Sequence, residues 1–165
     1  MQIEFRYAVR QDLVKIVEIY NQAIKLKNVT ADIRQISVSE REAWFENASI
    51  DKYPIWVVIS DDTIIGWFSL EPFYGREAYQ HTAEVSIYLD EIARGQHIGI
   101  QILEFLKTQL VGLDLTTLVA FIFKQNSPSI NLFTKQNFEI WGLLPRVAQI
   151  GENYLDLTIL GKQFI

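Results

Sequence analysis

The strongest constraint on the fold is a strand that leads through a short loop into a helix near the middle of the chain. Over residues 82–89 apolar and polar side chains alternate, as expected for a strand with one buried face. One face carries Ala83, Val85, Ile87 and Leu89, and the other carries Glu84, Ser86 and Tyr88. A loop containing Arg94-Gly95 follows, and the apolar spacing predicts a helix over residues 98–111. This unit predicts a mixed α/β fold.

Short periodic segments predict further elements on both sides of this unit. Asp12 is expected to cap the first helix, and Ser37 or Ser39 to begin a second helix with a capping box. Asp61-Asp62 is the signal of a hairpin turn. The other expected elements are strands at 2–8, 53–60, 63–71, 117–123, 138–145 and 153–160, and helices at 13–24 and 127–136. No repeat or linker is visible, so we expect a single domain over residues 1–165.

Composition and charge exclude several classes of site and partner. The chain contains no cysteine, which excludes disulfides, thiolate metal sites and cysteine nucleophiles. Its net charge is -5 and its basic residues form no stripe, so we expect no nucleic-acid partner. Neither a secretory signal nor a run of about 20 apolar residues is visible, so we expect a cytoplasmic protein without a membrane partner. We also expect no metal cofactor.

The loop after the central strand has the features of an anion-binding site. The first N–H groups of a helix have no partner within the helix and carry partial positive charge, so they bind phosphate groups. Gly95 and Gly99 would let the backbone approach an anion, and Arg94 would add a charge. The segment lacks both the Lys-Ser/Thr pair of a P-loop and the glycine spacing of a dinucleotide site. Taken alone, it is compatible with a phosphate site or with an ordinary turn.

These residues also resemble a known family. Arg94-Gly95-Gln96-His97-Ile98-Gly99 resembles the acetyl-CoA pyrophosphate loop of the GNAT superfamily of N-acetyltransferases, Gln/Arg-x-x-Gly-x-Gly/Ala. Further segments are similar, in the same order, to the phosphinothricin (methionine sulfoximine) acetyltransferase branch of that superfamily. They are residues 53–58, 79–88, 126–130, 135–138, 142–145 and 154–157. The resemblance covers nearly the whole chain.

The resemblance implies a fold and a cosubstrate. The fold would be mixed α/β and GNAT-like, with a central, mostly antiparallel twisted sheet, a splayed pair of central strands and flanking helices. Acetyl-CoA would bind in the slot between the splayed strands, its pantetheine arm pairing with the backbone of Ile87, Tyr88 and Leu89. The other residues implied in cofactor binding are Arg94, Gly95, Gln96, His97, Ile98, Gly99, Ile100, Asn126, Ser129 and Lys135. Asn126 could instead, or in addition, cap the helix that follows it.

His97 departs from the family pattern, because it occupies the position where the family usually has the first glycine of the loop motif. A side chain is tolerated there if φ is negative, since the group that binds the anion is the backbone N–H. The imidazole could direct a partial charge at a phosphate, or it could weaken cofactor binding.

Acetyl transfer to an amine needs a base, an oxyanion donor and a proton source for the departing thiolate. Glu84 is the expected base, because burial would raise its pKa and because it matches the acidic position that the branch uses as its base. A backbone N–H near Ile87 or Tyr88 is the expected oxyanion donor. Phe133 stands where the branch often has His and cannot donate a proton, so Tyr88 or water is the candidate acid. His81 is expected to be structural or a dimer contact.

Arg76 is the expected substrate-binding cation, because the branch places a cation here that holds the acid groups of its substrate. Tyr74 replaces a second basic residue of the branch. With Glu84, these residues predict a small-molecule primary amine as substrate, an amino acid or an analogue of the phosphinothricin or methionine sulfoximine type. Enzymes of this branch are commonly homodimers, so a homodimer is expected. Two alternatives remain: acetylation of a peptide N-terminus or protein lysine, and a catalytically idle acetyl-CoA-binding module.

Overall fold

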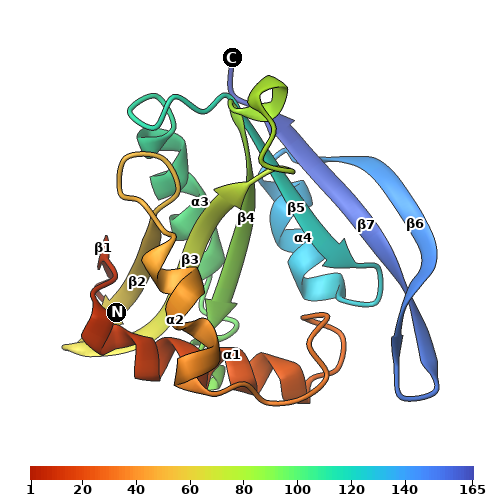
Figure 1. Ribbon diagram of the computed structural model, residues 1–165, viewed down its shortest axis with the longest axis horizontal. Helices are drawn as coiled ribbons and strands as arrows, with labels where there is room; N and C mark the ends of the chain where they lie inside the picture. The colour runs from red at the N-terminus through yellow and green to blue at the C-terminus, as the bar shows by residue number, and fades with distance from the viewer.

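The computed structural model describes residues 1–165 and contains one sheet of seven strands (Figure 1). The strands are β1 (Glu4–Tyr7), β2 (Ile55–Ser60), β3 (Thr63–Pro72), β4 (Thr82–Leu89), β5 (Thr117–Phe123), β6 (Glu139–Ile150) and β7 (Asn153–Gln163). The helices are α1 (Leu13–Lys25), α2 (Val38–Glu46), α3 (Ile98–Gln109) and α4 (Ser127–Lys135). The strand order is β1-β2-β3-β4-β5-β7-β6, and every neighbouring pair is antiparallel except β4–β5. The expected mixed α/β sheet is confirmed.

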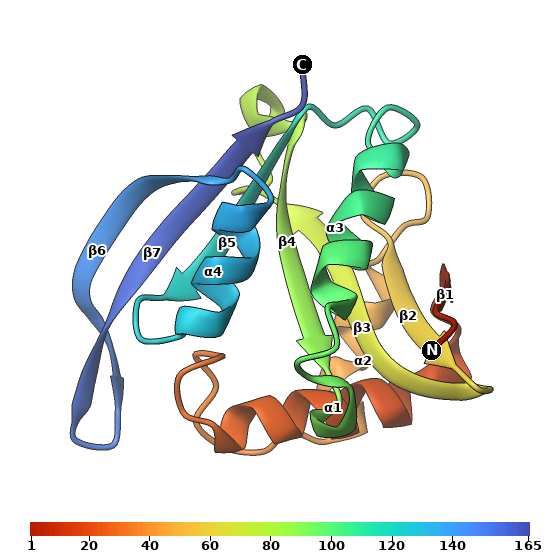
Figure 2. The same ribbon diagram turned by 180° about the vertical axis from the view of Figure 1, so that it is seen from behind.

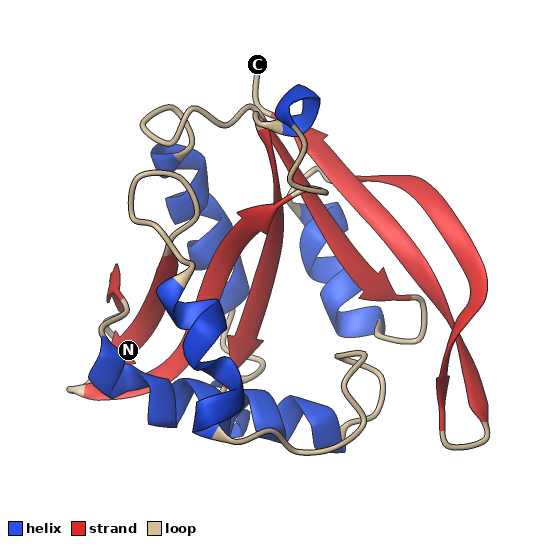
Figure 3. Cartoon of the chain, in the orientation of Figure 1, coloured by secondary structure: helices blue, strands red, loops and turns tan.

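Helices cover both faces of the sheet and divide the core into two layers. Figure 1 shows α1 and α2 on the near face, and Figure 2 shows α3 and α4 on the opposite face. The same arrangement is visible by secondary structure in Figure 3. Alternation along β2 sends Trp56 and Val58 into the layer with α3, and Ile55 and Val57 into the layer with α1. Because burial of each such side chain contributes about 1.5–3 kcal/mol, one strand stabilises both layers.

The two central strands separate after a short parallel contact. β4 is paired with β3 over seven positions, whereas it is paired with β5 at only three, the last being Glu84 with Val119. In Figure 1 the two strands meet near the top of the view and diverge toward the bottom. The expected splayed pair is therefore present, and β4 has a free edge after Glu84.

Two local signals in the sequence are confirmed. Ser37 and Glu40 form the capping box of α2, because the Ser37 hydroxyl accepts from the Glu40 N–H while the Glu40 carboxylate accepts from the Ser37 N–H. Asp61 and Asp62 form the turn between β2 and β3 and have φ values of 48° and 60°. Positive φ at both central residues gives the turn twist that a tight hairpin requires.

Asp12 is the N-cap residue of α1, as predicted, but its side chain does not cap the helix. Its carboxylate accepts no hydrogen bond from α1 and instead accepts two from the Arg6 guanidinium, at 2.7 and 3.0 Å. It also accepts from the Val9 N–H at 2.8 Å. A bidentate, charge-assisted pair is stronger than a bond to one helix N–H, so Asp12 holds β1 against the start of the helix instead.

The strand predicted at 138–145 is longer in the structure, because β6 continues past Pro145 to Ile150. The β6–β7 register shifts between Leu144 and Ala148, so the extra residues form a bulge rather than an end. Within the bulge the Arg146 N–H donates to the Asp156 carboxylate at 2.8 Å. That bond gives the Arg146 N–H an acceptor where the bulge interrupts the backbone pairing of β6 with β7.

Candidate active site

The free edge of β4 presents backbone groups to the gap beside β5. The Asp90 N–H donates to the Ile65 carbonyl at 2.9 Å, and this bond identifies which residues of β4 direct their backbone groups to β3. In an antiparallel pair, alternate residues direct both of their backbone groups to the partner strand. The backbone of Tyr88 therefore points to β3, while the backbone groups of Ile87 and Leu89 point to the gap. This alternation favours Ile87 and Leu89, and not Tyr88, as the residues whose backbone can pair with a molecule in the gap.

The turn between β4 and α3 contains two glycines for two different reasons. Gly95 has a φ of 75°, and nothing lies within 4 Å of the place that a Cβ would occupy, so its backbone conformation alone favours glycine. A Cβ on Gly99 would lie 2.6 Å from Leu132 Cδ2, so Gly99 lets α3 pack closely against α4. The first N–H groups of α3, on Ile98, Gly99 and Ile100, have no partner within the helix and give this end of the turn a partial positive charge.

His97 has a left-handed backbone conformation, with φ of 61° and ψ of 20°, directly before α3. The condition under which a side chain is tolerated at this position, a negative φ, is therefore not met. The turn keeps the backbone shape that glycine adopts without strain, and histidine adopts it at a cost of about 1–2 kcal/mol. The imidazole is exposed.

The other predicted cofactor residues lie on the segments that follow β4 and β5, on either side of the gap. Arg94 Nε and Gln96 Nε2 donate to backbone carbonyls of the preceding segment at 3.3 and 2.7 Å, which braces the loop. Asn126 is only 7% exposed, and its Oδ1 accepts from the Ser129 N–H at 3.3 Å, so its predicted role as a helix cap is confirmed. Lys135 is exposed in the last turn of α4.

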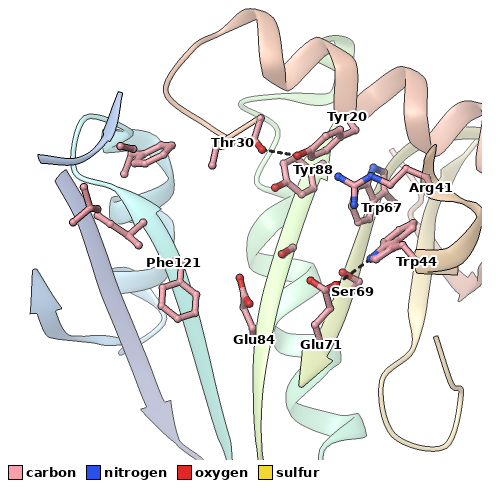
Figure 4. A pocket seen from close by; sticks show the side chains of 16 residues that line it. Tyr20, Thr30, Arg41, Trp44, Trp67, Ser69, Glu71, Glu84, Tyr88 and Phe121 are labelled. Carbon is pink, nitrogen blue, oxygen red and sulfur yellow. Dashed lines mark hydrogen bonds between the residues drawn. The ribbon is translucent and has the colours of Figure 1, made fainter. Parts of the chain in front are cut away.

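A pocket of about 430 Å³ lies on the α1–α2 face of the sheet (Figure 4). β3 and β4 contribute Trp67, Ser69, Glu71, Glu84, Ser86 and Tyr88 to its lining. The other walls come from α1, α2 and the segment between them, from β5, and from the β6–β7 hairpin. The polar face of β4 predicted from the alternation thus lines a single pocket.

Glu84 has an unusual electrostatic environment in this pocket. Burial raises the pKa of Glu84 to about 7, and the negative charge of Glu71 contributes to the rise. The two residues are directly opposite each other in the β3–β4 register. The Glu71 carboxylate accepts a hydrogen bond from Trp44 Nε1 at 3.1 Å, whereas Glu84 has no such donor. A carboxyl group with a pKa near 7 is partly ionised at neutral pH and can accept a proton from a substrate.

Tyr88 lies on the same wall of the pocket, packed against aromatic rings. Its ring centroid is 5.1 Å from that of Tyr20 and 4.8 Å from that of Trp67. Burial raises the pKa of Tyr88, and the neighbouring Tyr20 hydroxyl adds to the rise, so the Tyr88 hydroxyl stays protonated at neutral pH. Phe133 is a buried core residue that packs edge-on against Phe138, so that position offers no acid.

Comparison with known proteins identifies the family. The sequence model of the Acetyltransferase (GNAT) family matches residues 16–138. The chain belongs to this family. Among its relatives, YwnH of Bacillus subtilis (strain 168) is 40% identical over 159 residues, which are 96% of this chain and 97% of that protein. The L-methionine sulfoximine/L-methionine sulfone acetyltransferase of Pseudomonas aeruginosa is 32% identical and covers 97% of this chain and 94% of its own length.

Solved structures agree with this assignment. The phosphinothricin acetyltransferase of Sinorhizobium meliloti, solved with acetyl-CoA, has a TM-score of 0.92 and 28% identity, covering 99% of this chain and 89% of its own. The resemblance read from the loop and the flanking motifs is therefore confirmed, and this GNAT acetyltransferase uses acetyl-CoA as its cosubstrate. The free edge at Ile87 and Leu89 suits an amide-containing arm, and the start of α3 suits a pyrophosphate.

The substrate residues predicted between β3 and β4 lie outside the pocket of the acetyltransferase. Arg76 and Tyr74 are exposed, and neither contributes to the pocket lining. His81 Nδ1 lies 3.0 Å from the Asp114 carbonyl oxygen, which agrees with the structural role expected for it. The fold thus brings Glu84 and Tyr88 together but leaves Arg76 apart from them.

Three residues of α1 and α2 that the sequence analysis missed line the pocket: Tyr20, Arg41 and Trp44. Arg41 is the only cation among the lining residues. The one signal that could have identified it is helical spacing, because residues three apart on a helix share a face and Trp44 follows Arg41 at that distance. That spacing is common on helix surfaces, so it indicates no pocket by itself.

Proposed function

We propose that this acetyltransferase acetylates the primary amine of a small amino acid or amino acid analogue, with Glu84 as the general base. The observation that carries the proposal is the carboxyl group with a pKa of about 7 in a pocket beside the free edge of β4. The similarity to an acetyltransferase named for L-methionine sulfoximine and L-methionine sulfone supports the class of substrate.

In this proposal, Glu84 accepts the proton that the substrate's amine must lose. The amine nitrogen forms a bond to the acetyl carbonyl carbon, and the bond from that carbon to sulfur then breaks. The Ile87 N–H points to the gap and is our candidate for stabilising the negative charge on the acetyl oxygen, because the Tyr88 N–H is directed to β3. The departing thiolate takes its proton from the Tyr88 hydroxyl or from water.

Cofactor binding is assigned in the same proposal to the edge of β4 and the turn before α3. Ile87 and Leu89 hold the arm through their backbone, and the N–H groups of the segment 95–100 hold the pyrophosphate. Arg94 and Lys135 add positive charge, and Asn126, besides capping α4, is placed beside the gap by its position after β5. Gln96 and Ser129 complete the set predicted from the resemblance.

The dimensions of the pocket support a small molecule over a peptide. A volume of about 430 Å³ lies in the usual range of small-ligand sites. Thr30 and Ala31 of the α1–α2 segment close one side, and Val147 and Ala148 of β6 close another. A protein substrate would need an open groove in place of these walls.

We further propose a single catalytic domain over residues 1–165 and a homodimer. One continuous sheet runs through the chain from β1 to β7, which supports one domain. β6 exposes an unusual number of large apolar side chains, which supports an interface there. They are Ile140, Trp141, Leu143, Leu144 and Val147. None of the helices is both long and apolar enough to cross a membrane.

The test is acetyl-CoA turnover, followed by release of the free thiol, with amino acids, amino acid analogues, polyamines and peptides as acceptors. We expect turnover of amino acids and a loss of about 100-fold or more in kcat for Glu84→Gln, since a positioned base contributes about 10²–10⁴-fold. Arg76→Ala and Tyr74→Phe in the same assay test the two loop residues. Clear binding of acetyl-CoA without turnover of any amine would overturn the proposal in favour of an idle binding module.

A further inference from the structure

One side of the pocket carries a cation that proton removal and acetyl transfer do not use. Arg41 extends from α2, with its guanidinium carbon 4.4 Å from the centroid of the Tyr20 ring and 5.3 Å from that of Trp44. Figure 4 shows Arg41 beside Trp67 and Trp44, on the side of the pocket nearest the helices, with Glu84 on the other side facing Phe121. The two aromatic rings hold the guanidinium in place, so little side-chain freedom remains to be lost when it binds a ligand.

The partners of Arg41 within the chain leave most of its donors free. Its one ion pair is with Asp32, at 3.5 Å, and that carboxylate is itself about half exposed and accepts a hydrogen bond from the Tyr20 hydroxyl. A guanidinium has five N–H donors, and the Arg41 side chain is only 23% exposed. A half-buried cation with so few acceptors is suited to an anionic group that enters the pocket.

A second, independent feature points to the same kind of ligand. Trp67 Nε1 is buried in the wall of this pocket and has no hydrogen-bond partner in the chain, although the residue is only 3% exposed. An indole N–H can only donate, so its missing partner must be an acceptor. Ser69 Oγ, two residues further on the same face of β3, is also without a partner. Buried donors without partners are rare in proteins, and a ligand atom or water completes them.

We propose that Arg41 and Trp67 Nε1 form the subsite for the α-carboxylate of the substrate. This inference rests on the proposed function, and it identifies the substrate class as a zwitterionic α-amino acid. The ammonium group is then directed toward Glu84, on the opposite side of the pocket from the cation. A polyamine would bring a second cation toward Arg41, and a peptide N-terminus would bring an uncharged amide in place of the carboxylate.

Glu71 is linked to the cation side of the pocket through Trp44. Its carboxylate is already held by Trp44 Nε1 at 3.1 Å, while Trp44 contacts both Trp67 and Arg41 through its ring. Trp44 therefore connects the negative and the positive side of the pocket. Trp44 and Tyr20 are positioning residues, and only Arg41 and Trp67 touch the carboxylate.

The test compares two acceptors, L-methionine sulfone and its carboxamide, which differ in the α-carboxylate. Arg41→Met is expected to lower kcat/KM about 30-fold or more for the amino acid, because a charge-assisted contact is lost, and less than about threefold for the carboxamide. Trp67→Phe, which removes the N–H but keeps an aromatic ring, is expected to show the same selectivity with a smaller loss. Arg34→Met is the matched control, because Arg34 is an ion-paired arginine, 73% exposed, outside the pocket, and should change neither value.

An equal loss for both acceptors in Arg41→Met, or no loss for the amino acid, would overturn the inference. Failure of the proposed function is a separate result, in which Glu84→Gln keeps full activity or the wild type acetylates neither acceptor. In that case, equilibrium binding of L-methionine sulfone to the acetyltransferase still tests the subsite. The affinity must fall about 30-fold in Arg41→Met and stay unchanged in Arg34→Met, and any other result rejects it.

Discussion

Replacing Glu84 by glutamine should lower kcat by about 100-fold or more and, at the same time, stabilise the protein at alkaline pH. The pKa of this carboxyl rises from 4.5 to about 7 on folding, because burial and the charge of Glu71 oppose ionisation. Between these two pH values the folded state holds more protons than the unfolded state, so stability falls as the pH increases through the window. Glutamine has no proton to lose and removes this term.

The size of the effect follows from the same difference in pKa. A change from 4.5 to about 7, at about 1.36 kcal/mol per pH unit, corresponds to about 3 kcal/mol. Water at the open side of the pocket screens the charge, which reduces the expected gain to about 2 kcal/mol. For a chain of this length, that is about 4–8 °C in Tm at pH 8, and the gain should vanish near pH 4.5.

Urea denaturation of wild type and Glu84→Gln at pH 5 and pH 8 measures the difference directly. Glu77→Gln is the matched control, because it replaces an exposed carboxylate of the β3–β4 loop that lies outside the pocket. A difference in unfolding free energy between wild type and Glu84→Gln that is the same at both pH values would refute the reasoning. In that event the Glu84 carboxyl would be solvated rather than buried.

Three further predictions concern the loop, the base and the exposed strand. His97→Gly should stabilise the protein by about 0.5–1 kcal/mol, since the strain of the left-handed conformation exceeds the entropy cost of glycine. His97→Ala keeps the strain, so equal melting temperatures for the two variants would contradict this explanation. Glu71→Gln should shift the acid limb of the kcat/KM profile to lower pH, because it removes a charge that raises the pKa of the base. An unmoved limb would show that burial alone sets that pKa. Leu143→Glu, on the exposed face of β6, should convert the proposed homodimer to a monomer in light scattering with little change in monomer stability. A wild type that is already monomeric would remove the basis for this interface.

The central strand shows how much of the site the sequence could predict. Period-two alternation assigns Glu84, Ser86 and Tyr88 to one face, and all three line the pocket. The resemblance to acetyltransferases supplied the cofactor loop and the position of the base, and the family match confirms the family itself. The role of Glu84 itself remains a prediction, because it depends on chemistry that the fold only permits.

Sequence predictions failed where a second group competes for the same side chain, or where the backbone is fixed by the elements around it. Asp12 has the sequence context of a helix cap, but the Arg6 guanidinium competes for its carboxylate and is the stronger partner. A side chain at His97 would be tolerated without strain at a negative φ, but the residue has a left-handed conformation directly before α3. Pro145 reads as the end of a strand, yet pairing with β7 resumes after the bulge.

The sequence by itself therefore determined the order of the elements, the faces of the strands and the position of the glycine-containing turn before α3, because these depend on neighbours a few residues apart. Only the tertiary structure decided which cation enters the pocket. Arg76 lies close to Glu84 in the sequence but stays outside, whereas Arg41, more than 40 residues away, is brought in by α2 crossing the face of the sheet. A pocket forms where separate elements meet, and the spacing of residues along one element holds no information about that meeting.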